Sequence, residues 1–217
     1  MSNSLSLKKS RVTTIIVCLI VISSISIGFK LSYVDFNNPE IGEDTYVYVL
    51  GAFSIINGDF SQPDRKALGW SLFISPFYLL IDSVDLLDYL NITRILSIAI
   101  STITIVPMYI LARRFFDEKY SLVASCLFAF EPHLNYNSGT ALSEPLLILV
   151  LILSLNFILS DKTKYHYLAF IFTGLCWWVR LEAIYPAIAI ILIYFIIHRA
   201  KSNSLRNFFL CMIFLLI

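Results

Sequence analysis

The sequence predicts an all-α protein, a bundle of helices that crosses a membrane several times. Hydrophobic residues make up 58% of the 217 residues and charged residues 14%, and the mean hydropathy is +0.79. A soluble domain carries about 25% charged residues. The apolar residues form blocks of about 17–22 residues, which is the length that a helix needs to cross the hydrocarbon core. A membrane barrel would need short alternating segments, and the run Leu146–Leu155 does not alternate.

About seven spans are predicted, in a single transmembrane domain over residues 1–217 that is expected to be incomplete at its C-terminus. Basic residues precede the first apolar stretch without a cleavage site after it, which favours a retained signal anchor. The seventh span begins near Asn207, and Pro107 is expected to kink the second. The first six spans are Thr13–Phe29, Asn91–Ala112, Tyr120–Tyr136, Pro145–Leu159, Lys164–Val179 and Ile184–Ile197.

The segment Leu68–Ile81 is apolar but too short for a simple span. It has only about 14 residues, holds Gly69 and Pro76, and is followed by three aspartates, so we predict an interfacial or re-entrant helix. Charge bias supports this choice. With the N-terminus inside and no crossing here, 11 of the 16 basic residues lie on the inner side, as the positive-inside rule requires. If this segment crossed, Arg113 and Arg114 would face out.

The same topology gathers the acids on the outer side. Only Asp117, Glu118 and Asp161 face the cytoplasm, and the other 12 of 15 acids lie outside or at the outer boundary. Acidic residues contribute little to orientation, so the bias indicates a use for them outside. The net charge of +1 excludes a surface for nucleic acid. The four cysteines lie in apolar runs without metal-ligand spacing, so we interpret them as buried hydrophobes.

The first outer loop, residues 30–88, is expected to contain interfacial helices. Apolar residues recur at helical spacing between Asp44 and Asn57, so we predict an amphipathic helix on the outer surface that ends at Asn57-Gly58. Its apolar stripe consists of Tyr46, Val49, Leu50, Phe53 and Ile56.

Two acids, Glu43 and Asp44, stand at the start of this helix. Carboxylates suit the positive end of a helix dipole, so these acids either stabilise the first turn or provide a general base for an incoming hydroxyl. Later in the loop, Arg65 and Lys66 precede Trp70. This basic pair is either an orientation anchor or a site for an anionic lipid headgroup, because cations pair with phosphate oxygens.

Two ionisable residues, Glu131 and His133, interrupt an apolar run near membrane depth. Ionisable groups at this depth usually face a cavity or a partner. No second histidine stands at metal-ligand spacing from His133, so we expect it to form hydrogen bonds and not to bind a metal.

Two further segments place charges at the outer ends of spans. Ser143-Glu144-Pro145 favours the start of a helix, with Ser143 as the cap and Glu144 as an acid of the first turn. Arg180 follows two tryptophans at an outer boundary, where the positive-inside rule would not put a cation. It is expected to pair with Glu182 or Glu144, or to meet a phosphate.

Taken in order, four segments resemble the GT-C glycosyltransferases, nearest the branch of protein O-mannosyltransferases and lipid A aminoarabinose transferases. They are Glu43–Phe60, Arg65-Lys66, Ala141–Pro145 and Trp178–Glu182, and the resemblance extends over residues 13–197. It implies transfer of a sugar from a polyprenyl-phosphate donor to a lipid, glycan or protein acceptor, on the extracytoplasmic face of the cell membrane.

The resemblance also implies roles for individual residues. Asp44 is preferred narrowly over Glu43 as the catalytic base or acceptor-positioning acid; counting back from Asn57 favours Glu43 and counting forward to Ala52 favours Asp44. No cofactor is certain, and a divalent cation is left open. The residues expected to bind substrate are Arg65, Lys66, Glu144 and Arg180, with Glu131 and His133 as further polar groups.

The chain departs from the family pattern in two respects. Members usually have more spans, and their acidic pair commonly reads Asp-Glu, whereas this chain has Glu43-Asp44. We therefore expect an N-terminal portion or a truncated member, with its activity open. One alternative is a transporter or flippase with Glu131, Glu144 and Arg180 along its pathway, although no inverted repeat is present. The other is a non-catalytic membrane protein that binds lipid-linked sugars.

Overall fold

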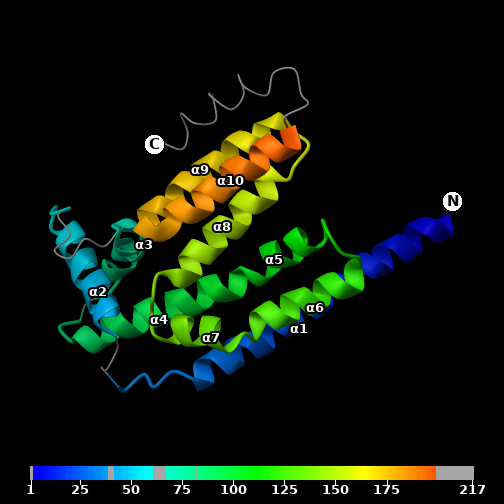
Figure 1. Ribbon diagram of the computed structural model, residues 1–217. Helices are drawn as coiled ribbons and strands as arrows, with labels where there is room; N and C mark the ends of the chain where they lie inside the picture. Colours follow the sequence, from blue (N-terminus) through cyan, green and yellow to red (C-terminus); the bar gives the residue numbers. More distant parts are fainter. Residues whose placement is uncertain (1, 39–41, 61–66, 82, 199–217) are drawn as a thin grey trace.

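A computed structural model describes residues 2–38, 42–60, 67–81 and 83–198, and these residues form helices and their connections without a strand. The predicted all-α class is therefore confirmed for this part of the chain. Figure 1 shows the helices in order. They are α1 (Ser2–Ser32), α2 (Glu43–Ile56), α3 (Gly69–Tyr78), α4 (Leu86–Ile103), α5 (Ile105–Ala112), α6 (Glu118–Ala129), α7 (Pro132–Gly139), α8 (Glu144–Ile158), α9 (Thr163–Val179), the 3₁₀ turn η1 (Leu181–Ala183) and α10 (Ile184–His198).

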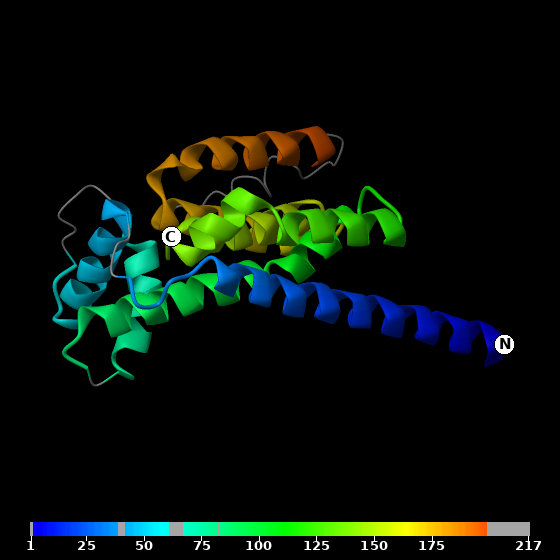
Figure 2. The same ribbon diagram turned by 90° about the horizontal axis from the view of Figure 1, so that it is seen from below.

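The long helices run along one direction, and the short ones gather at one end. Helices α8, α9 and α10 pack together, while α4 and α5 lie between α8 and the pair formed by α1 and α6. Helices α2 and α3 cross the end of the bundle at which α4 and α8 begin (Figure 1). Seen from below, the N-terminal part of α1 extends past the other helices (Figure 2).

Two stretches of helix in the described residues are long and apolar enough to cross a membrane, Arg11–Ser32 and Leu86–Ala112. They correspond to the first two predicted spans. The helices Glu144–Ile158 and Leu181–Ile197 are apolar but shorter. The total of seven spans stays a prediction, and the start of the seventh near Asn207 lies outside the described residues.

The predicted continuous span Tyr120–Tyr136 is wrong. Helix α6 ends at Ala129, and α7 starts at Pro132 after a break. Pro132 has no backbone N–H, and it disfavours the helical conformation of the residue before it. Glu131 accordingly has ψ 122°, and its Oε2 accepts a hydrogen bond from the Leu134 backbone N–H at 2.6 Å. The 12 residues of α6 are about 18 Å long, well short of the ~30 Å hydrocarbon core.

A second break, between α4 and α5, confirms the expected kink. Pro107 cannot donate to the carbonyl of Ile103, and the α-helix is interrupted at Thr104. The carbonyl oxygen of Pro107 accepts a hydrogen bond from Nδ2 of Asn156 at 3.0 Å, which ties the bent segment to α8.

The two helices predicted in the outer loop are both present. Helix α3 has 10 residues, as expected of a helix too short to cross. Helix α2 ends at Ile56, with Gly58 at a positive φ of 80°, as the Asn57-Gly58 pair indicates. The predicted apolar stripe of α2 is partly wrong, because Leu50 is 55% exposed. The buried residues of α2 are Thr45, Tyr48, Val49, Gly51 and Ala52, since this face packs on α3 through small side chains and hydrogen-bonded polar groups.

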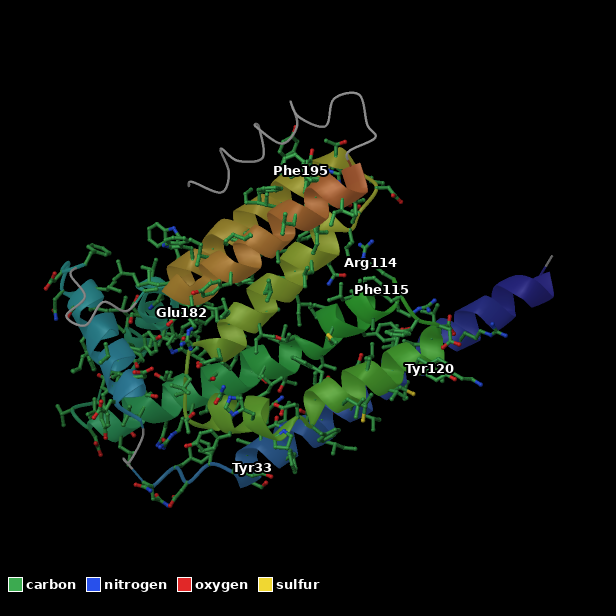
Figure 3. The ribbon with its side chains drawn as sticks, in the orientation of Figure 1. Tyr33, Arg114, Phe115, Tyr120, Glu182 and Phe195 are labelled. Carbon is green, nitrogen blue, oxygen red and sulfur yellow. The ribbon has the colours of Figure 1, made fainter. Side chains whose placement is uncertain are left out.

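At the other end of the bundle, an arginine ties two helix ends together. Arg114 donates to the backbone oxygens of Asn156 at 2.7 Å and Leu159 at 2.8 Å, and so satisfies carbonyls in the last turn of α8. Figure 3 shows Arg114 near the end of α8, far from Tyr33 and Glu182 at the opposite end. The basic pair Arg113–Arg114 and the acids of α2 therefore lie at opposite ends of the molecule, which is the sidedness that the charge pattern predicts.

Candidate functional site

The N-terminal end of α2 is held against the segment that joins α7 to α8. The Thr45 hydroxyl donates to the Thr140 carbonyl at 2.8 Å, and the hydroxyls of Tyr48 and Ser143 lie 3.1 Å apart. Both α2 residues are buried. Ala141 has a φ of 61°, and its carbonyl accepts from the indole of Trp70 on α3 at 3.1 Å. Helices α2 and α3 therefore both contact this joining segment, which is remote from them in the sequence.

The two candidate catalytic acids occupy the first turn of α2. Gly42 precedes them and supplies no side-chain cap. Glu43 is exposed, whereas Asp44 is half-buried and precedes the buried Thr45. Both carboxylates lie at the positive end of the helix dipole. Their first-turn placement is as predicted, and Asp44 is the more buried of the two.

Glu144, Arg180 and Glu182 form a charged group at the ends of α8 and α9. Nη1 of Arg180 pairs with Oε1 of Glu144, and Nε lies 3.3 Å from Oε2 of Glu182. Both pairings expected for Arg180 are thus present. Burial lowers the pKa of Arg180, but the nearby carboxylates of Glu144 and Glu182 more than offset this, so its pKa lies above the ordinary value. The guanidinium is a permanent cation at this place.

This charged group is directly linked to α2. Ser143, expected to cap α8, makes no capping hydrogen bond; its hydroxyl meets that of Tyr48 instead. Tyr48 is also close enough to Arg180 to interact with it electrostatically. The sequence-predicted residues Asp44, Glu144 and Arg180 are therefore brought to one region, through Tyr48 and Ser143.

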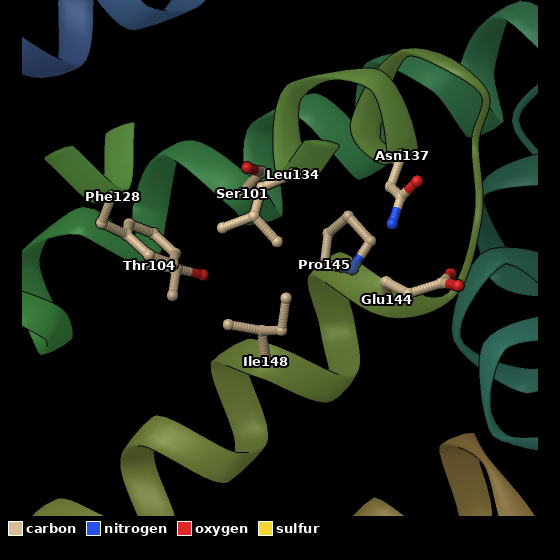
Figure 4. Close-up of a pocket in the computed structure, with 8 residues that line it drawn as sticks. All are labelled: Ser101, Thr104, Phe128, Leu134, Asn137, Glu144, Pro145 and Ile148. Carbon is tan, nitrogen blue, oxygen red and sulfur yellow. The ribbon is translucent and has the colours of Figure 1, made fainter. Parts of the chain in front are cut away.

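The second oxygen of Glu144 faces the interior. Oε2 is buried and has no hydrogen-bond partner among the described residues. Glu144 also lines a cavity of about 10 Å³, the space of one water molecule, together with Ser101, Thr104 and Asn137, but Figure 4 shows its carboxylate directed away from this cavity. In Figure 4, Asn137 and Glu144 lie on one side of this cavity and Thr104 and Phe128 on the other.

The remaining predicted site residues are not brought into this group. Glu131 caps α7, which explains a carboxylate in an apolar run, and His133 is exposed on the same helix. Neither makes a hydrogen bond or ion pair to Arg180 in the described part of the chain. Arg65 and Lys66 lie outside the described residues. No group of three or more His, Cys, Asp or Glu that could hold a metal occurs among the residues described.

Sequence reasoning missed two buried cations. Arg94 on α4 is 3% exposed and donates to the carbonyls of Asp35 at 3.1 Å and Asn38 at 2.8 Å. Lys30 on α1 is 1% exposed, and its Nζ lies 2.8 Å from the Ser26 hydroxyl. The available signal was the position of Arg94 inside an apolar helix, because an ionisable residue there usually faces the protein interior.

Removing the Glu144 carboxylate is expected to destabilise the protein more than removing that of Glu182. The side chain of Glu144 is 25% exposed and that of Glu182 is 68% exposed, although both pair with Arg180. We expect Glu144→Gln to lower the free energy of unfolding by about 1–3 kcal/mol, between the values for exposed and buried pairs. The matched control Glu182→Gln should lower it by less than about 1 kcal/mol. Denaturant unfolding in detergent measures both, and equal losses would contradict the prediction.

The described residues form an all-helical protein with two candidate membrane-spanning helices and a charged group at one end of the bundle. The family model of the dolichyl-phosphate-mannose-protein mannosyltransferases matches residues 74–217, more than half of the chain. The chain therefore belongs to this family of GT-C mannosyltransferases, as its sequence motifs predict. No curated protein and no solved structure matches the chain. The matched region contains Glu144 and Arg180, and α2 with its two acids precedes it.

Proposed function

We propose that this protein transfers a sugar from a polyprenyl-phosphate donor to a hydroxyl of an acceptor on the extracytoplasmic face of the membrane. The observation that carries the proposal is the link from the acidic start of α2 to the Glu144–Arg180 pair, through Tyr48 and Ser143. The reaction needs a base for the acceptor hydroxyl and a cation for the departing phosphate, and this region offers one of each. The family match supports glycosyl transfer as the reaction class.

In the proposed reaction, the acceptor oxygen attacks the anomeric carbon of the sugar. The bond from this carbon to the phosphate oxygen breaks, and its electron pair leaves with the polyprenyl phosphate. Asp44 accepts the proton of the acceptor hydroxyl, and Arg180 stabilises the charge on the departing phosphate. The ion pairs of Arg180 use Nε and Nη1, and a guanidinium has five N–H donors, so donors remain for the phosphate.

Glu144 serves as a positioning residue in this proposal. Its Oε1 forms an ion pair with the guanidinium of Arg180. Because Glu144 belongs to the first turn of α8, this ion pair positions the guanidinium relative to that helix. Arg65 and Lys66 are proposed to bind the lipid phosphate as additional cations, as the family resemblance implies. Glu131 and His133 stay in the proposal only as polar neighbours on α7.

The orientation that we propose has a cytoplasmic N-terminus and the site outside. It rests on the separation of the Arg113–Arg114 end from the α2 end together with the positive-inside rule. A cysteine at Asp59, an exposed residue just after α2, should react with an impermeant maleimide added to intact cells. A cysteine at Asp161, in the α8–α9 loop, should react only after permeabilisation; the reverse result would overturn the orientation.

The function itself is tested by reconstituting the protein with a polyprenyl-phospho-mannose and candidate acceptors. We expect release of polyprenyl phosphate together with mannose bound to the acceptor. Movement of the sugar lipid across the bilayer without release of polyprenyl phosphate would overturn the proposal and favour the flippase alternative. Binding of the sugar lipid with neither reaction would favour a non-catalytic binding protein.

A further inference from the structure

A second cavity, of about 140 Å³, lies next to the candidate site and shares Thr140 with it. Its walls come from the segment that follows α1, from α4 and from the end of α7. The residues that matter for its chemistry are Tyr33, Asp35, Asn38, Arg94, Tyr136 and Thr140. The sequence motifs described above assign a functional role to none of these residues.

The lining combines two exposed aromatic rings with several polar groups. Tyr33 is 55% exposed and Tyr136 is 59% exposed, so a ligand can reach both rings. A tyrosine offers an apolar face and a hydroxyl that donates or accepts a hydrogen bond. Asp35, Asn38 and Thr140 add carboxylate, amide and hydroxyl groups. A ligand with apolar C–H faces and many hydroxyls, such as a sugar ring, matches this combination.

The charges around the cavity argue against an anionic ligand. Arg94 is the cation here, and three of its five N–H groups already bond: Nη1 to the Asp35 carbonyl and to Oδ1 of Asn91, and Nη2 to the Asn38 carbonyl. Its Nε is buried and has no hydrogen-bond partner among the described residues. The Asp35 carboxylate also lies close enough to interact with it electrostatically. Arg94 therefore holds the chain segment after α1 in place, and the cavity as a whole is nearly neutral.

The size of the cavity fits a single ring. A cavity of about 150 Å³ accommodates a six-membered ring such as benzene, and this cavity has a volume of about 140 Å³. It is too small for a disaccharide or for a folded peptide loop. One monosaccharide ring of a larger molecule, with the rest of that molecule outside, is compatible with this volume.

We propose that this cavity binds one sugar ring of the acceptor, so that the acceptor is a glycan or a glycosylated molecule. The inference rests on the proposed function. The position of the cavity favours the acceptor over the donor. Thr140, which lines the cavity, accepts a hydrogen bond through its carbonyl from Thr45, the residue that follows Asp44. Arg180, the proposed phosphate ligand, instead pairs with Glu144, further along the chain from Thr140. A ring held here presents a hydroxyl on the cavity side of the proposed base, with the donor phosphate on the other.

Ligand-detected saturation-transfer NMR on the full chain in detergent tests this site without relying on activity. The probes are methyl hexopyranosides, methyl pentopyranosides and inorganic phosphate. We expect at least one glycoside to bind, and Tyr33→Ala and Tyr136→Ala each to weaken that binding roughly fivefold through loss of a ring contact. Tyr120→Ala is the matched control, because Tyr120 is 67% exposed and lies at the opposite end of the bundle (Figure 3). It should bind as the unaltered protein does.

Several results would overturn the site. These are no binding of any glycoside, binding that both cavity variants leave unchanged, or phosphate competing for the cavity. Kinetics then separate acceptor from donor: Tyr33→Ala should raise the KM of a glycan acceptor and leave the KM of the donor unchanged. A raised donor KM would contradict the acceptor assignment. Tyrosine-dependent glycoside binding in a chain without any transfer would support the cavity and count against the proposed function.

Discussion

Replacing Asp44 by Asn is expected to lower the rate of sugar transfer by about 10²–10⁴-fold, the usual contribution of a general base. Asp44 is half-buried at the start of α2 and precedes Thr45, whose hydroxyl bonds to Thr140. Glu43→Gln should have a much smaller effect, because Glu43 is exposed in the same helical turn. Release of polyprenyl phosphate by the reconstituted protein measures both rates.

The control for this pair is Asp59→Asn, which removes an exposed carboxylate just beyond the other end of α2. It should leave the rate unchanged. A double variant, Glu43→Gln with Asp44→Asn, that turns over at the original rate would remove both acids from the mechanism. If Glu43→Gln lowers the transfer rate more than Asp44→Asn does, Glu43 is the base and Asp44 is not, and the site still lies at the start of α2.

Gly69→Ala is expected to destabilise the protein by about 1–3 kcal/mol or more, the usual cost of overpacking. Gly69 starts α3 and lies against the end of α9. A Cβ on Gly69 would lie 2.8 Å from the backbone nitrogen of Val179 and closer still to the carbonyl of Trp178. These are backbone atoms, so they cannot move aside as the end of a flexible side chain would. Thermal unfolding in detergent measures the loss.

Gly42→Ala is the matched control for this change. A Cβ on Gly42 would meet nothing within 4 Å, so Gly42→Ala should lower the unfolding temperature much less than Gly69→Ala, only by the modest amount by which Ala is poorer than Gly at an N-cap. Because Trp178 and Val179 directly precede Arg180, a folded Gly69→Ala protein should also show slower transfer. Equal stability of the two alanine variants would mean that α3 does not pack closely on α9.

Local sequence was sufficient for the helices whose ends have a chemical signal. The Asn57-Gly58 pair ends α2, Pro107 accompanies the break after α4, and Glu144-Pro145 starts α8. The break between α6 and α7 had its signal in Glu131-Pro132, but the long apolar run around it favoured one continuous span. Capping and the missing N–H of proline outweighed hydrophobicity there.

Pairings between remote segments were only partly predictable. Arg180 was expected to find Glu144 or Glu182, because an outward cation near a boundary needs a partner, and it finds both. The hydroxyl pair of Tyr48 and Ser143 had no such signal, since neither residue carries charge and they are 95 positions apart in the sequence. The buried face of α2 was misjudged for a related reason: Thr45 and Ala52 are buried by close contact with other helices, and hydrophobicity alone does not show this.

The sequence by itself determined the helical class, the two long apolar helices, the gathering of acids at one end and the family, because these depend on composition, periodicity and local motifs. Only the tertiary structure decided that the start of α2 meets Thr140–Ser143, that Glu144 holds Arg180, and that Arg94 closes a cavity beside them. Such contacts join residues tens of positions apart. Their geometry depends on how helices of given length pack, which no single segment of the chain specifies.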